Sequence, residues 1–365
     1  MPLSLLAGRS GADLRVALDS LLAENAFLSA AAMQAGAAAR LDELIGVSSA
    51  LDANTLTLAE IVGTLKGGAT ANAFADAWRG QSADLVSYAQ GQQAPASADL
   101  EARRGVLASQ LAVGNFSSAD ASSGLQRRTQ AELMFVDSAN SAQRMAALLE
   151  SGDDLGRPLA AAMAAQFSDL SPQTTEGADI DLRLRLVSGL EEHVLLTGAA
   201  VAAAADGRAT EAQADSDAAG AAADRLGAAL APGDAATGLS ADVGSGVAVR
   251  LRSQTGAMVS AASGGDRGQA AQDMDRLRGE IDALLSGANP LLPPGLVAQQ
   301  LRASDQPLLT SADAFVARDY ATAFARLHES VHQAQKPAET VAEAIVDRYP
   351  ARFLAMPRPA ATDTP

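Results

Sequence analysis

The segment His328-Glu329-Ser330-Val331-His332 is the part of this chain whose residue types and spacing come closest to a chemical site. It matches the pattern H-E-x-x-H, in which two imidazoles one helical turn apart bind zinc and the glutamate activates the bound water. A metalloprotease also needs a third ligand. Glu343 lies beyond His332 by roughly 16 Å along a continuous helix, at 1.5 Å per residue, which is too far to share the metal. The motif therefore predicts metal binding without catalysis, and we expect no enzyme.

All three histidines of the chain lie in its second half, where a helical bundle could bring them together. Glu192 or Asp305 offers a carboxylate that could complete the shell. Imidazole and carboxylate ligands suit Zn²⁺ and Cu²⁺. We predict a site at His193, His328 and His332, with Cβ atoms within about 6–9 Å of a common point. The residues leave an alternative open, in which these histidines are solvated side chains on exposed helix faces.

The charge balance limits the classes of partner. The 365 residues carry 43 acidic and 27 basic side chains, a formal net charge of −16. Duplex DNA and anionic membrane surfaces both require a basic footprint, so neither is expected as a partner. The absence of cysteine excludes disulfides, thiolate catalysis and cysteine-ligated metal centres. We interpret the paired arginines Arg103-Arg104 and Arg127-Arg128 as surface ion-pair partners.

The composition is typical of a helical protein. Hydrophobic residues make up 48% of the chain but aromatic residues only 3%, and alanine dominates stretches such as 199–205. Alanine favours helices because it loses no side-chain entropy there. Apolar residues recur at helical spacing, for example at Leu14, Leu18, Leu21 and Leu22. We predict an all-α fold in which each half forms a four-helix-bundle-like domain of five to six helices.

The two halves of the chain align with one another. At an offset of 168 residues, Asp13-Leu14-Arg15 falls on Asp181-Leu182-Arg183, and Arg40 falls on Arg208. Further along, Arg104-Gly105 falls on Arg278-Gly279 at an offset of 174 residues. Loop insertions between retained helices produce a drift of this kind. We therefore predict two tandem, diverged copies of one helical bundle.

Glycine and proline mark the expected ends of the helices. The breaks fall at Lys66-Gly67-Gly68, Gly91–Pro95 and Gly114–Ser118 in the first half, and at Asp206-Gly207, Pro232-Gly233, Gly264-Gly265 and Gly287–Pro294 in the second. Pro158 and Pro337 lie in or near the last helix of each copy. The predicted domains are residues 1–172 and 173–355, joined by a linker near 171–177, and residues 356–365 are expected to form a disordered tail.

Neither a membrane span nor a signal peptide is expected in this chain. No segment shows the roughly 18 consecutive apolar residues that a spanning helix requires. The first residues, Met1–Arg9, lack a charged region followed by a full apolar core. A mature secreted chain from which a signal peptide had been removed would look the same.

Several short motifs carry a family resemblance. They are Leu51-Asp52-Ala53-Asn54-Thr55 and Trp78-Arg79 in the first half, and Leu190–Val194, Gly287–Pro290 and Arg348–Phe353 in the second. With them the chain resembles a family of bacterial alanine-rich tandem helical-bundle proteins, some labelled copper amine oxidase-like. The resemblance covers nearly the whole chain and implies a location in the cell envelope or outside the cell. It also implies histidines near His193 and the 328–332 turn, whereas the first copy has Asn25 at the position of His193.

These features lead to two expected functions of different classes. The first is a non-enzymatic interaction or structural protein of the cell envelope or exterior, which associates with a protein partner or with itself, because alanine-rich helices can approach closely. The alternative is a helical protein that binds Zn²⁺ or Cu²⁺ through the histidines of the second copy. A small-ligand sensor is a third reading, but such modules are normally bracketed by membrane-spanning helices.

Overall fold

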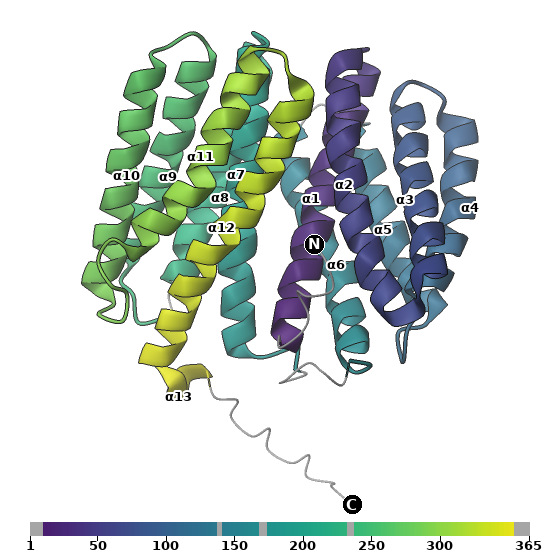
Figure 1. Ribbon diagram of the computed structural model, residues 1–365, viewed down its shortest axis with the longest axis horizontal. Coiled ribbons are helices and arrows are strands. Elements are labelled where there is room, and N and C mark those ends of the chain that lie inside the picture. The colour runs from purple at the N-terminus through teal and green to yellow at the C-terminus, as the bar shows by residue number, and fades with distance from the viewer. Residues whose placement is uncertain (1–9, 137–140, 168–173, 232–236, 354–365) are drawn as a thin grey trace, which may run out of the picture.

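A computed structural model describes residues 10–136, 141–167, 174–231 and 237–353. Helices make up the regular structure of these ranges, which confirms the predicted all-α class. They are α1 (Gly11–Ala37), α2 (Leu41–Lys66), α3 (Gly68–Ala89), α4 (Gln93–Leu111), α5 (Ser118–Val136), α6 (Ser141–Ala164), α7 (Ala178–Ala205), α8 (Ala209–Leu230), α9 (Ala241–Ala262), α10 (Arg267–Ala288), α11 (Leu296–Val316), α12 (Tyr320–Arg348) and α13 (Pro350–Phe353). They stand side by side with α1, α2, α7 and α12 in the middle, α3 and α4 at one end, and α9 and α10 at the other (Figure 1).

Local sequence signals account for the ends of several helices. Helix α1 begins at a capping box, in which the Ser10 hydroxyl accepts a hydrogen bond from the Asp13 amide and the Asp13 carboxylate accepts one from the Ser10 amide. Helix α2 ends at Gly67, whose φ of +83° suits glycine. Pro158 and Pro337 lie inside α6 and α12, as predicted. The predicted break at 232–233, residues 171–173 of the predicted linker, the 172/173 boundary and the predicted tail lie outside the described residues.

Helices α1 and α7 occupy the centre of the molecule. Both are long and apolar enough, by length and composition, to cross a membrane, and 78% of the apolar window of each is buried inside the fold. The central helix of a bundle needs apolar residues on every side, because other helices surround it. These two helices are thus more apolar than the sequence analysis expected, and their burial is what a core helix requires.

Reciprocal ion pairs join α1 to α7. Arg15 Nη1 lies 3.5 Å from Asp181 Oδ1, and Arg183 Nη2 lies 2.6 Å from Asp13 Oδ1. At the 168-residue offset Arg15 corresponds to Arg183 and Asp13 to Asp181, so each ion pair is the counterpart of the other. Corresponding turns of α1 and α7 therefore lie next to each other. Further along the same interface, the Ser20 hydroxyl donates to the buried Glu191 carboxyl group at 2.8 Å. The internal duplication itself stays a prediction.

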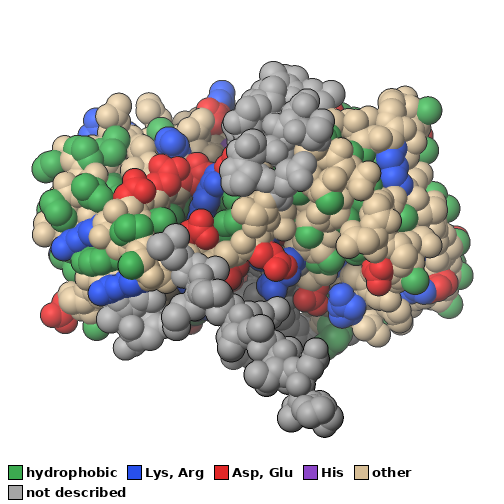
Figure 2. Space-filling view, turned by 90° about the horizontal axis from the view of Figure 1, so that it is seen from below, with side chains coloured by type: hydrophobic (Ala, Val, Ile, Leu, Met, Phe, Trp, Pro, Cys, Tyr) green, Lys and Arg blue, Asp and Glu red, His purple; other side chains and the backbone are tan. Residues whose placement is uncertain are grey.

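The hydrophobic core does not divide at the midpoint of the chain. One buried cluster lies within α1–α6 and includes Phe74 and Trp78, whose ring centroids are 5.1 Å apart. The other fills α7–α12 but also contains Met33 of α1 and Val47 of α2. The two predicted domains therefore share a continuous core. Seen from below, the described surface carries acidic and basic side chains interspersed (Figure 2).

Candidate metal site between α1 and α12

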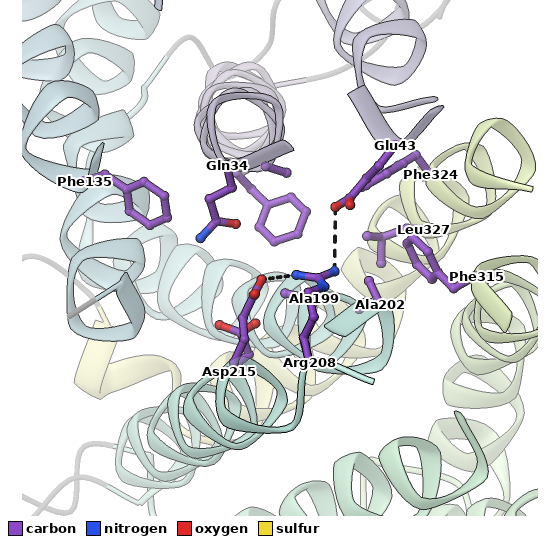
Figure 3. A pocket seen from close by; sticks show the side chains of 14 residues that line it. Gln34, Glu43, Phe135, Ala199, Ala202, Arg208, Asp215, Phe315, Phe324 and Leu327 are labelled. Atoms are coloured by element: carbon purple, nitrogen blue, oxygen red, sulfur yellow. Dashed lines mark hydrogen bonds and ion pairs between the residues drawn. The ribbon is translucent and has the colours of Figure 1, made fainter. Parts of the chain in front are cut away.

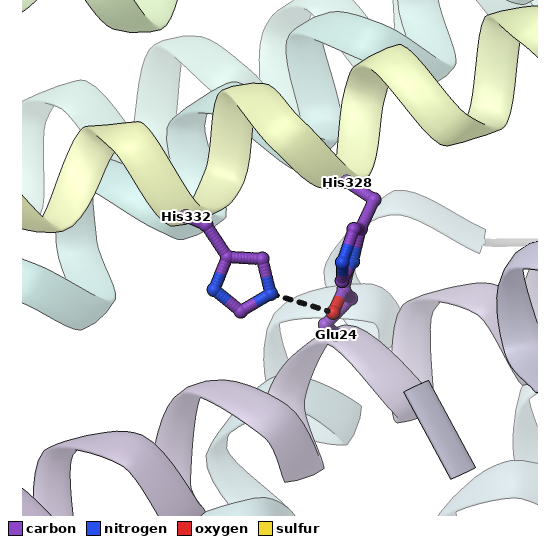
Figure 4. Close-up of side chains that lie close together, drawn as sticks. All are labelled: Glu24, His328 and His332. Carbon is purple, nitrogen blue, oxygen red and sulfur yellow. Dashed lines mark hydrogen bonds and ion pairs between the residues drawn. The ribbon is translucent and has the colours of Figure 1, made fainter. Parts of the chain in front are cut away.

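His328 and His332 lie one turn apart on α12 and face α1. Their ring centroids are 4.3 Å apart, and the Glu24 carboxylate of α1 lies between the two helices, beside both rings (Figure 4). One ligand atom from each of the three side chains lies within 4.8 Å of the others. Helix α12 brings the histidines together by local periodicity, and only helix packing adds Glu24.

The contacts within this group are short. His328 Nδ1 is 2.6 Å from Glu24 Oε1, and His332 Nε2 is 3.7 Å from Glu24 Oε2. In a tetrahedral zinc shell, bonds of about 2.0–2.1 Å hold ligand atoms roughly 3.3 Å apart. Shifts on the order of 1 Å would therefore convert this hydrogen-bonded group into a metal-binding one.

Glu24 acts on the two histidines differently. Burial opposes protonation of His328, but the hydrogen bond and the charge of Glu24 outweigh it and raise the pKa of His328 above its usual value. Burial lowers the pKa of His332, although the charge of Glu24 acts in the opposite direction. The site thus holds one imidazole that favours a proton and one that favours the neutral form, which is the form a metal requires.

Asn54 of α2 orients the Glu24 carboxylate. Its Nδ2 donates to Glu24 Oε2 at 2.9 Å and to the Leu21 carbonyl oxygen at 3.0 Å. Asn54 is fully buried. Outer partners of this kind orient metal ligands and tune their affinity.

The hydrogen-bond chain continues into the core of α1–α6. Asn25 Nδ2 donates to Asn54 Oδ1 at 3.0 Å, and Asn25 Oδ1 accepts from Arg128 Nη2 at 2.7 Å and from Trp78 Nε1 at 3.1 Å. The interpretation of Arg128 as a surface side chain is wrong, because it is 0% exposed and pairs with buried Glu132 at 3.1 Å. From Arg128 through Asn25 and Asn54 to Glu24, each side chain donates a hydrogen bond to the next, so two buried amides link the guanidinium to the carboxylate.

His193 is the predicted ligand that the structure does not bring to this group. It lies on α7, is 4% exposed, and its Nδ1 donates to the Ala219 carbonyl oxygen of α8 at 3.0 Å. Burial lowers the pKa of His193 to about 4, so the ring is neutral at pH 7. The third position beside His328 and His332 belongs to Glu24 instead: α12 packs against α7 and α2, and its two histidines reach across to Glu24 of α1.

The two predicted supporting carboxylates have other partners. Glu192 pairs with Arg225 of α8 at 2.6 Å. Asp305 of α11 pairs with buried Arg278 of α10 at 2.8 Å, and burial raises the pKa of Asp305 to about 6 even though Arg278 opposes this. Neither belongs to the group formed with His328 and His332.

A second polar group lies around a cavity of about 30 Å³, whose lining includes residues of α1, α2, α7, α8 and α12 (Figure 3). Arg208 pairs with Glu43 at 3.8 Å and also with Glu211. Burial raises the pKa of Asp215, which also lines this cavity, to about 7. A cavity of this size holds about one water molecule. This group joins the two halves of the chain and offers no room for a larger ligand.

Glu24 and Asn54 are the residues that sequence reasoning missed. The 168-residue offset aligned Glu24 with Glu192, so an acidic residue at this turn of both central helices was visible in the sequence. Nothing in the sequence showed that Glu24 on α1, and not Glu192 on α7, faces α12.

Comparison with known proteins returned no matching family model, curated protein or solved structure. The resemblance to alanine-rich envelope proteins stays a prediction, and a function has to be inferred from the site.

Proposed function

We propose that this protein binds a divalent transition-metal ion, Zn²⁺ or Cu²⁺, through Glu24, His328 and His332. The observation that carries the proposal is that ligand atoms from α1 and α12, more than 300 residues apart in sequence, lie within 4.8 Å of one another. Two imidazoles and one carboxylate form a donor set that these ions accept. An ion bound there would join the first helix to the last long helix.

The exposures of the three side chains support entry of an ion. The Glu24 side chain is 2% exposed, whereas those of His328 and His332 are 30% and 21% exposed. A buried carboxylate with two half-buried imidazoles over it gives the ion a path from solvent that ends at a negative charge. Binding would also compete with protonation of His328, because only the neutral imidazole can ligate an ion.

The proposed role of the ion is structural. Glu329, which would activate water in an H-E-x-x-H protease, pairs with Arg326 at 2.6 Å on the half-exposed face of α12. The ion would cross-link α1 and α12 and so stabilise the packing of the two halves. This role agrees with the non-enzymatic function, in the cell envelope or outside the cell, that the sequence led us to expect.

Thermal unfolding with and without Zn²⁺ tests the proposal. Zn²⁺ should raise the melting temperature of the unmodified protein. At a free Zn²⁺ concentration one hundred times the dissociation constant, the free energy of unfolding should increase by about 2.7 kcal/mol. Glu24→Gln and His332→Asn should each abolish the rise. His193→Asn is the matched control and should keep it. Loss of the effect in His193→Asn with retention in Glu24→Gln would mean that the site predicted from sequence is correct and this one is not.

A second measurement covers the case in which a variant fails to fold. In the unmodified protein, NMR signals of the three imidazole rings can be followed as Zn²⁺ is added. Signals of His328 and His332 should shift, and that of His193 should not. Equal shifts of all three, or of none, would contradict the proposal.

Self-association is a second candidate function, favoured by one observation. Leu41 and Ile45 lie one turn apart at the start of α2 and are 64% and 68% exposed. Such a pair offers an apolar contact for a partner protein or a second copy. Light scattering at micromolar concentration should detect an oligomer that Leu41→Gln/Ile45→Gln dissociates, and a monomer at every concentration would remove this candidate.

A further inference from the structure

A cleft of about 570 Å³ lies between α1, α6 and α7, apart from the residues of the metal site. Clefts of this size hold small organic molecules. Part of its wall is apolar and consists of Ala23 of α1 with Leu184 and Leu195 of α7. The remainder is polar and carries charges of both signs.

Most acidic groups that line the cleft are already neutralised by neighbours. Asp181 and Asp19 pair with the buried guanidinium of Arg15 at 3.5 and 3.6 Å. Glu192 pairs with Arg225. Because Asp181 and Asp19 share one guanidinium, these pairs compensate two of the three negative charges of the wall.

Glu191 adds no negative charge at neutral pH. Its carboxyl group is 2% exposed and accepts hydrogen bonds from Ser20 at 2.8 Å and from Gln335 at 2.8 Å. Burial raises the pKa of Glu191 to about 8, and the nearby charges of Glu24 and Asp19 act in the same direction. The protonated group does not repel an anion.

Arg185 is a cation of the cleft wall without an ion pair to the described residues. It is exposed, lines the cleft, and makes no hydrogen bond or ion pair with the part of the chain that the structure describes. Ser188, three residues further along α7, lines the cleft on the same face of the helix. Arg157 of α6 stands in the opposite wall. A guanidinium and a hydroxyl one turn apart are donors suited to a carboxylate.

We infer that this cleft binds a small organic anion with one carboxylate and an apolar body. The carboxylate would pair with Arg185 and Ser188, and the body would lie against Leu184 and Leu195. Phosphorylated or polyanionic ligands fit less well, because Asp19 and Asp181 lie in the same wall and the chain carries a net charge of −16. This inference does not depend on the proposed metal site.

Calorimetric titration of the metal-free protein in EDTA tests the inference, with hexanoate as the probe. Hexanoate should bind, and acetate, hexanamide and inorganic phosphate should each bind at least tenfold more weakly, because each lacks either the tail or the single carboxylate. Arg185→Gln should weaken hexanoate binding at least tenfold, and Arg185→Lys should restore part of it. Arg252→Gln removes an exposed arginine paired with Asp224 on another face and should leave binding unchanged.

The inference would be overturned by no binding of hexanoate at millimolar concentration, by equal binding of hexanamide, or by equal binding of hexanoate to Arg185→Gln. Stronger binding of phosphate than of hexanoate would also contradict it. Since EDTA removes metal ions, none of these results bears on the site at Glu24, His328 and His332. Arg185 is exposed, so its substitution should not prevent folding, and the circular dichroism spectrum of the variant checks this.

Discussion

His328 and Glu24 are separated by 304 residues in sequence, yet His328 Nδ1 lies 2.6 Å from Glu24 Oε1. The carboxylate favours the protonated imidazole and raises the pKa of His328 despite burial of the ring. A histidine whose pKa is higher in the folded than in the unfolded state stabilises the fold fully below pH about 6.5. That stabilisation is lost as the pH rises through the folded-state pKa.

Glu24→Gln should therefore lower the pKa of His328, because burial then acts without an opposing charge. NMR titration of the ring signals in metal-free protein measures this value directly. The pKa of His193, which is set by its own burial on α7, serves as the internal control and should not change. An unchanged pKa of His328 in Glu24→Gln would show that the two groups do not interact in solution.

Asn54→Leu should weaken Zn²⁺ binding by about 10–100-fold, because the carboxylate loses the amide that orients it. The same change leaves Asn25 without its acceptor and should destabilise the protein by about 1–3 kcal/mol. Thr55→Val is the matched control. It removes a buried hydroxyl on the same helix that donates to Leu51, and it should leave Zn²⁺ affinity as it is. Equal affinities of the two variants for Zn²⁺ would mean that Asn54 has only a structural role.

Glu191→Gln should remove a large part of the pH dependence of stability. The carboxyl group has a pKa of about 8 in the fold, against about 4.5 when unfolded, so its contribution is favourable below pH 4.5 and is lost as the pH rises to 8. The glutamine oxygen can accept from Gln335 and its amide group can donate to the Ser20 hydroxyl, so both contacts persist without a titrating group. At pH 8 the variant should be more stable by on the order of a few kcal/mol, and near pH 4.5 the two proteins should be similar. Urea unfolding at both pH values checks this, and parallel pH profiles would contradict it.

Gly46→Ala should separate α2 from α12. A Cβ atom at Gly46 would lie 2.6 Å from Tyr320 Cβ and 2.7 Å from its backbone carbon, and backbone cannot move aside cheaply. We expect a loss of about 1–3 kcal/mol in the free energy of unfolding, together with weaker Zn²⁺ binding, since α12 carries both histidines. Gly256→Ala on α9 is the control, because nothing lies within 4 Å of the added atom. It should stabilise the protein by about 0.5–1 kcal/mol, as alanine does in an open helix. A Gly46→Ala variant as stable as Gly256→Ala would show that the two helices are not in this contact.

The sequence by itself determined the features that depend on near neighbours in the chain. The alanine content and the spacing of Leu14, Leu18 and Leu21 predicted helices, and Gly67 and Gly207 predicted where two of them end. The pairing of His328 with His332 also followed from sequence, because residues four apart on a helix project from the same side.

Only the tertiary structure decided which side chains meet the histidine pair. His193 and Glu24 both lie on central helices, and only His193 was predicted as a ligand, but the structure pairs His193 with the Ala219 carbonyl and places Glu24 beside the histidine pair. The same packing takes Arg128 out of solvent and connects it to Glu24 through two buried amides. Such contacts depend on how rigid helices rotate and cross, and side chains far apart in sequence set these angles together. Neither the composition of the chain nor the spacing of its residues shows which side chains meet when the helices pack.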